Sequence, residues 1–130
     1  MKIEIKSSID ELSIVENFVD DLNAKLDLSD EIYGNIMIAV TEAVNNSIVH
    51  GNANDINKKI QIEVFQKNPN IVSFRIQDEG PGFDVQKVKD PTLPENIESI
   101  GGRGIFVMKH LSNEMIFNDP GNSIELRFLI

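Results

Sequence analysis

The sequence predicts an α+β fold, a two-layer sandwich in which helices cover one face of a mixed, mostly antiparallel β-sheet. Two observations lead to this prediction. The N-terminal half holds two long segments whose apolar residues recur at helical spacing. The strand-like segments that follow come in pairs joined by short turns, as antiparallel hairpins do. Helices that are separate along the chain from such hairpins are expected to pack together on one sheet face.

The chain is expected to begin with a short strand and a helix. Alternating polar and apolar residues predict the strand at Lys2–Lys6. The helix is expected over Ile9–Leu26, with Ser7 or Ser8 as its N-cap. Its apolar positions, three or four residues apart for the most part, are Leu12, Val15, Phe18, Val19, Leu22 and Leu26.

A second helix is predicted from about Asp30 to His50. Ser29 is its expected N-cap, and Gly51 is a natural C′ residue just beyond its end. One face of this helix is apolar and should pack on the sheet. The residues of that face are Ile36, Ala39, Val40, Ala43 and Val44.

The rest of the chain is expected to hold two hairpins, a long loop and one further helix. The loop, a polar and irregular segment, runs from about Asp84 to Ile100, and a loop of this length in a compact domain is more often functional than idle. Strands are expected at Lys58–Gln66, Ile71–Gln77, Glu114–Asn118 and Ser123–Ile130, and a helix at about Ile105–Leu111.

Length and composition limit the classes of function. The chain has 130 residues, close to the common size of one domain, so a single domain over residues 1–130 is expected. Its net charge of −9 makes nucleic acid and anionic membranes poor partners. The absence of cysteine excludes disulfides, thiolate metal sites and cysteine nucleophiles. Neither a signal peptide nor an apolar run of roughly 20 residues is visible, so we expect a cytoplasmic protein.

Polar residues inside the second predicted helix need an explanation. At about 100° per residue, Glu42, Asn46 and His50 fall on one side, and Asn45 flanks them. A solvated helix face is the ordinary interpretation, and His50 in the last turn is expected chiefly to cap the helix. However, asparagine is a poor helix-interior residue, and two stand together here. The alternative is that Glu42 and Asn46 face a pocket, where a carboxylate can accept a proton and an amide oxygen can ligate Mg²⁺.

Two glycine-rich segments flank the long loop. In the first, Asp78 ends a strand and Gly80 and Gly82 follow, so the backbone can adopt positive φ or approach a ligand closely. The Asp78 carboxylate could accept a hydrogen bond from an exocyclic amine such as that of adenine. An ordinary turn is the simpler interpretation of this short motif.

In the second segment, Gly102 and Gly104 stand directly before a predicted helix, with Arg103 between them. The free N–H groups and the dipole of a helix N-terminus can bind an anion, and the Arg103 guanidinium could add donors to a phosphate. A flexible hinge is the alternative. The spacing fits neither a Rossmann fingerprint nor a Walker motif.

Together, the three segments resemble the sequence boxes of the GHKL superfamily, whose ATP-binding domains have the Bergerat fold. Glu42–Asn46 is similar to its N box, Asp78–Gly82 to its first glycine box, and Gly102–Gly104 to its second. The resemblance covers nearly the whole chain and is greatest to the bacterial anti-sigma-factor serine/threonine kinases. Relatives often carry a basic residue just before the second glycine box, where this chain has Asn96–Ile100, and Arg103 could substitute for it.

The resemblance implies ATP and Mg²⁺ as cofactors and gives roles to the matched residues. Asp78 would bind the adenine amino group, beside Gly80 and Gly82. Asn46 would ligate a Mg²⁺ ion that bridges the phosphates, and Asn45 could assist it.

The remaining implied roles concern the phosphates and their transfer. Gly102, Arg103 and Gly104 would hold the phosphates, and the loop Phe83–Ile100 would form an ATP lid. Glu42 would be the general base that activates an attacking hydroxyl, since a serine hydroxyl alone is a weak nucleophile.

The function that the resemblance implies is that of an ATP-dependent protein serine/threonine kinase in a partner-switching pathway. Such a protein would bind a sigma factor or another effector, phosphorylate a serine or threonine of an antagonist protein, and form a homodimer. Two alternatives stay open: a non-catalytic binding protein regulated by ATP or ADP, and the catalytic domain of a sensor histidine kinase. Neither a phosphoacceptor helix pair nor a sensor segment is visible in the sequence for the latter.

Overall fold

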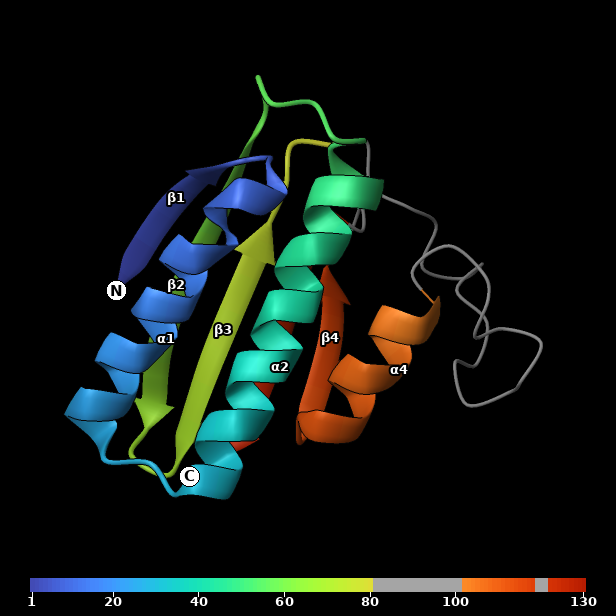
Figure 1. The fold of residues 1–130 in the computed structure, drawn as a ribbon. Coiled ribbons are helices and arrows are strands. Elements are labelled where there is room, and N and C mark those ends of the chain that lie inside the picture. Colours follow the sequence, from blue (N-terminus) through green and yellow to red (C-terminus); the bar gives the residue numbers. More distant parts are fainter. Residues whose placement is uncertain (81–101, 119–121) are drawn as a thin grey trace.

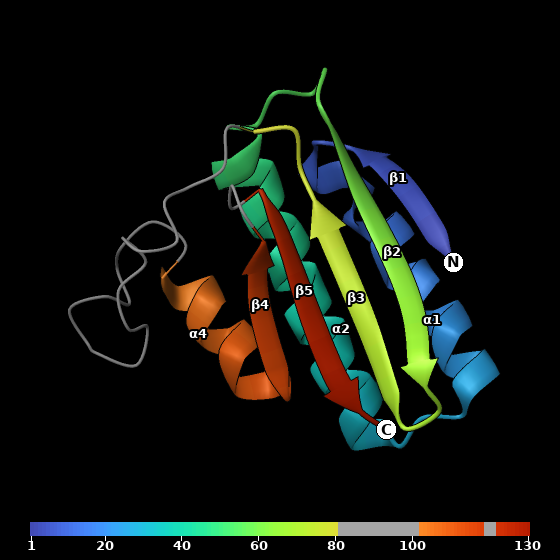
Figure 2. The same cartoon turned by 180° about the vertical axis from the view of Figure 1, so that it is seen from behind.

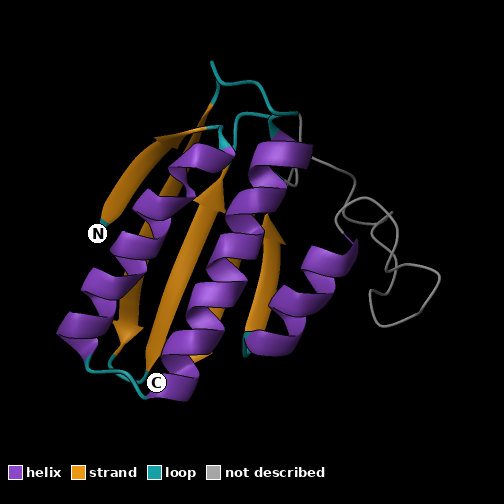
Figure 3. Cartoon of the chain, in the orientation of Figure 1, coloured by secondary structure: helices purple, strands orange, loops and turns teal. Residues whose placement is uncertain are grey.

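The structure, a computed structural model, describes residues 1–80, 102–118 and 122–130. Helices lie in one layer and strands in the other, which confirms the predicted α+β sandwich (Figures 1 and 3). The predicted loop from Asp84 to Ile100, the lid Phe83–Ile100 that contains it, and Gly82 lie outside the described residues.

The sheet has five strands in the order β1-β2-β3-β5-β4. Every described pairing is antiparallel, so the expected mixed component is not present among these strands. For two of the pairings the reason is the short connection along the chain, two residues between β2 and β3 and four between β4 and β5. A short connection between paired strands permits only the antiparallel arrangement. The bounds are β1 Lys2–Lys6, β2 Lys59–Asn68, β3 Ile71–Gln77, β4 Glu114–Asn118 and β5 Ser123–Leu129.

The helices begin at the expected caps. The Ser8 hydroxyl accepts a hydrogen bond from the Asp10 N–H at the start of η1 (Ile9–Glu11), which leads into α1 (Leu12–Leu26). The Ser29 hydroxyl accepts one from the Ile32 N–H, 3.2 Å away, at the start of α2 (Asp30–Asn46). Each cap satisfies a backbone donor that has no partner within the helix.

Two helix ends differ from the sequence prediction. The second helix does not stay α-helical to His50: it ends at Asn46 and continues as a π-helical turn, η2 (Ser47–Gly51). The last helix, α4, spans Gly102–Leu111 and so begins earlier than the predicted Ile105. Contacts with other segments explain both differences and are described with the site below.

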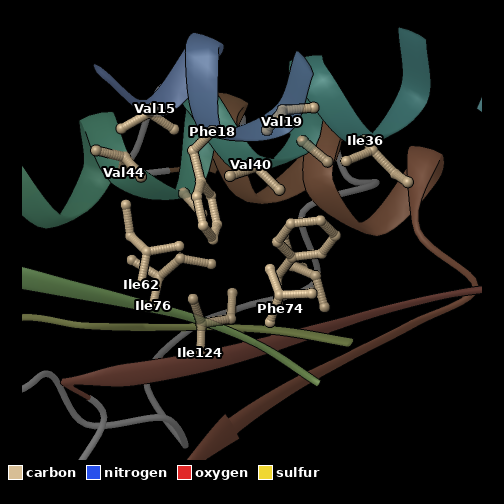
Figure 4. Packing of buried hydrophobic residues seen from close by; sticks show 14 of the residues in the cluster. Val15, Phe18, Val19, Ile36, Val40, Val44, Ile62, Phe74, Ile76 and Ile124 are labelled. Carbon is tan, nitrogen blue, oxygen red and sulfur yellow. The ribbon is translucent and has the colours of Figure 1, made fainter. Parts of the chain in front are cut away.

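The core lies between the helices and one face of the sheet. The predicted apolar face of α2 is fully buried, and Val15, Phe18, Val19 and Leu22 of α1 are buried beside it. Figure 4 shows these helix side chains packed against side chains of the central strands. The sheet residues labelled there are Ile62, Phe74, Ile76 and Ile124.

No helix covers the opposite face of the sheet in the described chain (Figure 2). Charged side chains lie there instead, with Glu125 of β5 bonded to Arg75 of β3 at 3.1 Å and to Arg127 at 2.6 Å. Among the described residues, no helix combines the length and the apolar character that crossing a bilayer requires.

Candidate functional site

The polar stripe and the described residues of both glycine segments meet along α2 and η2. Helix α2 and strand β3 end at the same end of the molecule, and α4 lies beside α2 (Figure 1). Two clusters result: one forms where α4 begins, against the last two turns of α2, and the other where the chain leaves β3, against η2.

The first cluster joins Glu42, Asn46 and Gly104. Both polar side chains are half-buried, and they converge on the backbone of Gly104, which lies in the first turn of α4. A Cβ atom placed on Gly104 would lie 3.1 Å from Glu42 Oε2 and 3.4 Å from each amide atom of Asn46. Glu42 and Asn46 therefore face the N-terminal turn of α4. No side chain separates them from its backbone, because the residue there is Gly104.

The second cluster places Asp78 between two glycines. A Cβ atom on Gly51, the last residue of η2, would lie 2.1 Å from Asp78 Oδ2, and one on Gly80 would lie 1.9 Å from the Gly51 carbonyl oxygen. No side chain fits at either position. The Asp78 carboxylate occupies the space that the missing Gly51 side chain leaves.

The Asp78 carboxylate is held in a poorly solvated place, because its residue is only 8% exposed. Burial raises the pKa of the Asp78 carboxyl, since the charged form loses hydration. Hydrogen bonds from the Gly80 N–H, at 2.8 Å, and from the Ser47 hydroxyl favour the charged form and partly oppose this rise in pKa, as does the Lys58 charge. A second carboxylate oxygen faces Gly51 and can accept a further hydrogen bond.

Three polar residues near Asp78 were not predicted from the sequence. Ser47 bonds its carboxylate, Asn122 bonds its backbone, and Asn52 bonds the Glu79 N–H that follows it. Asn52 and Ser47 are buried, and a polar residue inside a buried helix end is a signal that sequence reading could have used. Nothing in the sequence marks Asn122, whose role depends on the register of β3 against β5.

The structure corrects the reasons assigned to three glycines. Gly51 is not a left-handed C′ residue; the positive φ angles that follow η2 lie at Ala53 and Asn54, at 52° and 60°. Gly80 likewise needs no positive φ, and its backbone approaches the Gly51 backbone closely. Gly104 lies inside the helix rather than before it, and its missing side chain leaves space for Glu42 and Asn46.

The remaining predicted site residues within the described chain lie on α2, η2 and α4. Asn45 is half-buried on α2, and the 100° rotation per residue turns it away from Asn46. His50 lies exposed in η2, near the helix end where capping was expected. Gly102 and Arg103 lie in the first turn of α4, so their backbone N–H groups belong to its N-terminus.

The two clusters differ in the chemistry that they can recognise. Asp78 is a hydrogen-bond acceptor and suits an amino group, whereas the N-terminus of α4 suits an anion. They lie about five residues apart along one helix, roughly 7 Å at 1.5 Å per residue. One extended ligand with an amino group at one end and phosphates at the other could contact both.

The first cluster also fits a hard cation. Amide and carboxylate oxygens are ligands for Mg²⁺, which usually keeps several waters and binds phosphate oxygens as well as protein. No cluster of three or more His, Cys, Asp or Glu occurs in the described part of the chain. Because Glu42 would otherwise repel a phosphate, a cation beside Asn46 would also make the site compatible with an anionic ligand.

Comparison with known families agrees with this geometry. A sequence model of the family described as histidine kinase-like ATPase domain matches residues 5–128. The chain therefore belongs to this family of kinase-like ATPase domains, which confirms the GHKL resemblance.

Individual relatives are anti-sigma factors and a protein kinase. The chain is 31% identical over 130 residues to an anti-sigma F factor of Thermoanaerobacter sp. (strain X514), covering 98% of this chain and 90% of that protein. An anti-sigma F factor of Geobacillus stearothermophilus is 33% identical over 103 residues, covering 76% of this chain and 68% of the relative. The serine-protein kinase RsbW of Staphylococcus aureus is 31% identical over 96 residues, covering 68% and 60%.

A solved structure shows the same fold. The crystal structure of the RsbU and RsbW domains of Rv1364c from Mycobacterium tuberculosis superposes with a TM-score of 0.70 over 99% of this chain. The sequences are 15% identical, and this chain corresponds to 31% of that longer protein.

Proposed function

We propose that this chain is an ATP-dependent protein serine/threonine kinase that binds a sigma factor or another effector and phosphorylates an antagonist protein. The observation that carries the proposal is the alignment of an amine-accepting cluster and an anion-accepting cluster along one helix. ATP has these two chemistries at its two ends. The anti-sigma F factors and the serine-protein kinase among its relatives support this class of kinase.

Binding follows from the two clusters. The Asp78 carboxylate, which already accepts the Gly80 N–H and the Ser47 hydroxyl, accepts a further hydrogen bond from the adenine amino group. The Gly51–Gly80 contact fixes where this carboxylate lies. The N–H groups at the start of α4 face the phosphates, with Gly102, Arg103 and Gly104 as the residues of that turn. Asn46 would hold Mg²⁺ through its amide oxygen, and bound Mg²⁺ would offset the charge of the phosphate oxygens.

Transfer needs a base beside the phosphates, and the proposed base is Glu42, whose carboxylate lies against Gly104 at the start of α4. Its carboxylate would take the proton of a substrate serine or threonine as the hydroxyl oxygen forms its bond to the γ-phosphorus. The bond from the γ-phosphorus to the β,γ-bridging oxygen breaks, and ADP leaves with that oxygen. Asn46, one turn further along α2, keeps the phosphates within reach of Glu42.

The proposal extends to the assembly. Residues 1–130 would act as one domain and as a homodimer, in line with the resemblance to anti-sigma-factor kinases. Light scattering of the purified chain would measure the mass directly, and a monomer with full kinase activity would remove the homodimer from the proposal.

The activity can be tested with the natural partner. The purified chain is used to capture proteins from a lysate of its own organism in the presence of Mg²⁺ and ATP or ADP. The captured protein is then incubated with Mg²⁺ and γ-labelled ATP, and its phosphosites are mapped. We expect acid-stable phosphate on a serine or threonine.

Glu42→Gln should abolish transfer without abolishing nucleotide binding. Loss of a general base lowers the rate by roughly 10²–10⁴-fold, while the amide keeps the size of the side chain. Glu31→Gln, in the first turn of the same helix, is the matched control and should transfer normally. Acid-labile phosphate on histidine would favour a sensor histidine kinase, and binding without any transfer would favour a nucleotide-regulated binding protein.

A further inference from the structure

Asn52 is a fully buried polar residue, 0% exposed, directly after η2. Its side-chain oxygen accepts a hydrogen bond from the Glu79 N–H at 2.8 Å, and its side-chain nitrogen donates one to the Lys59 carbonyl oxygen at 3.1 Å. Its own N–H donates to the Ser47 carbonyl oxygen at 2.8 Å. A buried amide with this set of partners connects the segments that carry them.

Those bonds join three parts of the chain: the π-helical turn, the start of β2, and the turn that follows β3. Glu79 is the residue after Asp78, and its carboxylate in turn accepts the Lys59 N–H. On the other side, the Asp78 N–H donates to the Asn122 carbonyl oxygen at 2.9 Å. Asp78 is thus anchored to β5 through Asn122 and to the helix layer through Asn52.

We propose that Asn52 is a positioning residue that fixes Asp78 at the base-binding place and so determines the preference for a 6-aminopurine nucleotide. This inference rests on the proposed function. Asn52 touches no ligand atom itself; it acts by holding the Asp78–Gly80 backbone against Gly51. Hydrogen bonds weaken steeply with distance and angle, so a shift of about 1 Å in that backbone would remove the bond to the base.

The test compares ATP with inosine triphosphate, which has the same phosphates but a 6-oxo group in place of the amino group. The ratio of the two affinities measures the base contact alone, because the phosphate contacts cancel. Binding of each nucleotide is measured with Mg²⁺ in the wild type, Asn52→Ala and Asn113→Ala. Asn113 is the matched control: it also accepts a backbone N–H from another segment, that of Leu129 at 2.8 Å, but it does not contact the Asp78 turn.

The wild type should prefer ATP by roughly 10- to 100-fold, as expected for a hydrogen bond to a charged group. In Asn52→Ala this ratio should fall close to one while the affinity for inosine triphosphate stays within about twofold. Asn113→Ala should keep the wild-type ratio.

If Asn52 had a purely structural role, Asn52→Ala would bind both nucleotides more weakly by the same factor, and the ratio of affinities would be unchanged. That result would overturn the inference. A wild type that binds neither nucleotide would instead overturn the proposed function together with it. If Asn52→Ala does not fold in a thermal melt, Asn52→Ser takes its place. Its shorter hydroxyl cannot satisfy both partners, so the ratio should again fall, and a retained ratio would again contradict the inference.

Discussion

Asp78 has a carboxylate whose two oxygens have different tasks. One accepts the Gly80 N–H, and the other faces the space left by Gly51. An amide at this position would have only one oxygen for the Gly80 N–H, the Ser47 hydroxyl and a ligand amine. The single residue therefore decides whether an amino group can be accepted at this end of the site.

Asp78→Asn should weaken ATP binding by about 1.5–3 kcal/mol, or roughly 10- to 100-fold, because its amide oxygen stays with the Gly80 N–H and its NH₂ group faces the adenine amine. Calorimetric titration with Mg²⁺-ATP measures the loss. Asp55→Asn, at a half-buried carboxylate on the loop before β2, is the control and should bind normally. Unchanged affinity in Asp78→Asn would contradict the assignment of Asp78 to the base.

The same substitution should change how stability depends on pH. Burial raises the folded-state pKa of Asp78, so the stability that this group contributes is present below its unfolded pKa and is lost as pH rises through the folded value. Because an asparagine side chain does not ionise, the Asp78→Asn variant does not lose this stability as the pH rises. The free energy of unfolding of Asp78→Asn, measured by urea titration without nucleotide, should therefore rise relative to the wild type from about pH 4 toward neutrality. A relative stability that falls over this range would contradict the stated environment of Asp78.

At the residue scale, the polar groups of the site could be predicted from the sequence, but not all of the residues that surround them. Glu42 and Asn46 could be paired because four residues make about one helical turn, and the structure does bring them together. Ser47 and Asn52 were missed because their partners lie about 27–31 residues further along the chain, at a distance that no local pattern reports.

At the scale of elements, the π-helical turn η2 is the element that positions Gly51 beside Asp78. It inserts an i→i+5 bond, from the Asn52 N–H to the Ser47 carbonyl oxygen, at the end of α2. Such turns are rare and frequently occur at functional sites. Here the turn brings Gly51 against Asp78. The predicted α-helix, continued to His50, did not include this contact.

Substitution by alanine should have opposite effects on stability at two glycines of the α2–η2 segment. Gly34 lies in α2, and a methyl group added to it would meet no atom within 4 Å, so Gly34→Ala should stabilise the fold by about 0.5–1 kcal/mol. Gly51→Ala would place Cβ 2.1 Å from Asp78 Oδ2 and should destabilise the fold by about 1–3 kcal/mol and abolish ATP binding. Chemical denaturation of both variants checks the pair, and equal effects would refute the close contact at Gly51.

Gly104→Ala should separate stability from binding. Its Cβ atom would lie 3.1 Å from the end of the Glu42 side chain, which can move, and alanine favours the helix. Stability should therefore change by less than about 1 kcal/mol, while the methyl group displaces Glu42 and Asn46 and lowers Mg²⁺-ATP affinity by roughly tenfold. Gly34→Ala is again the control. Normal nucleotide binding by a folded Gly104→Ala would remove Gly104 from the site.

The elements themselves were largely predictable, and their ends were less so. Alternation placed β1, β3 and β4 at their observed bounds, and the caps Ser8 and Ser29 set two helix starts. The end of α2 and the start of α4 were misplaced because tertiary contacts of Gly51 and Gly104 decide them. Helix propensity alone penalises glycine and so predicts a later start for α4.

At the scale of the whole molecule, the two layers bring the described parts of the matched segments together toward one end of the helix layer. The sheet buries one face against α1 and α2, and a row of ion pairs keeps the other face polar. That row runs across four strands through Glu63, Arg75, Glu125, Arg127 and Glu114. The class of fold could be predicted from hairpins and amphipathic helices, whereas the convergence of distant segments could be expected only from the family resemblance.

Mg²⁺-ATP should stabilise the whole domain, because it binds the folded chain and not the unfolded one. At 100 times the dissociation constant the gain is about 2.7 kcal/mol, which corresponds to a rise of roughly 10 °C in the melting temperature of a chain this size. Thermal melts with and without nucleotide measure it, and Asp78→Asn at the same ATP concentration should show a smaller rise. Equal shifts in both proteins would place the nucleotide away from Asp78.

The convergence of the three segments on one nucleotide can be tested most directly by a crystal structure with Mg²⁺ and a non-hydrolysable ATP analogue. We predict one nucleotide, its adenine amino group hydrogen-bonded to Asp78 and its phosphates at the first turn of α4. The Mg²⁺ ion should lie at about 2.1 Å from the Asn46 amide oxygen. A nucleotide bound elsewhere, or one that leaves Asp78 and Asn46 without contacts to it, would contradict the account.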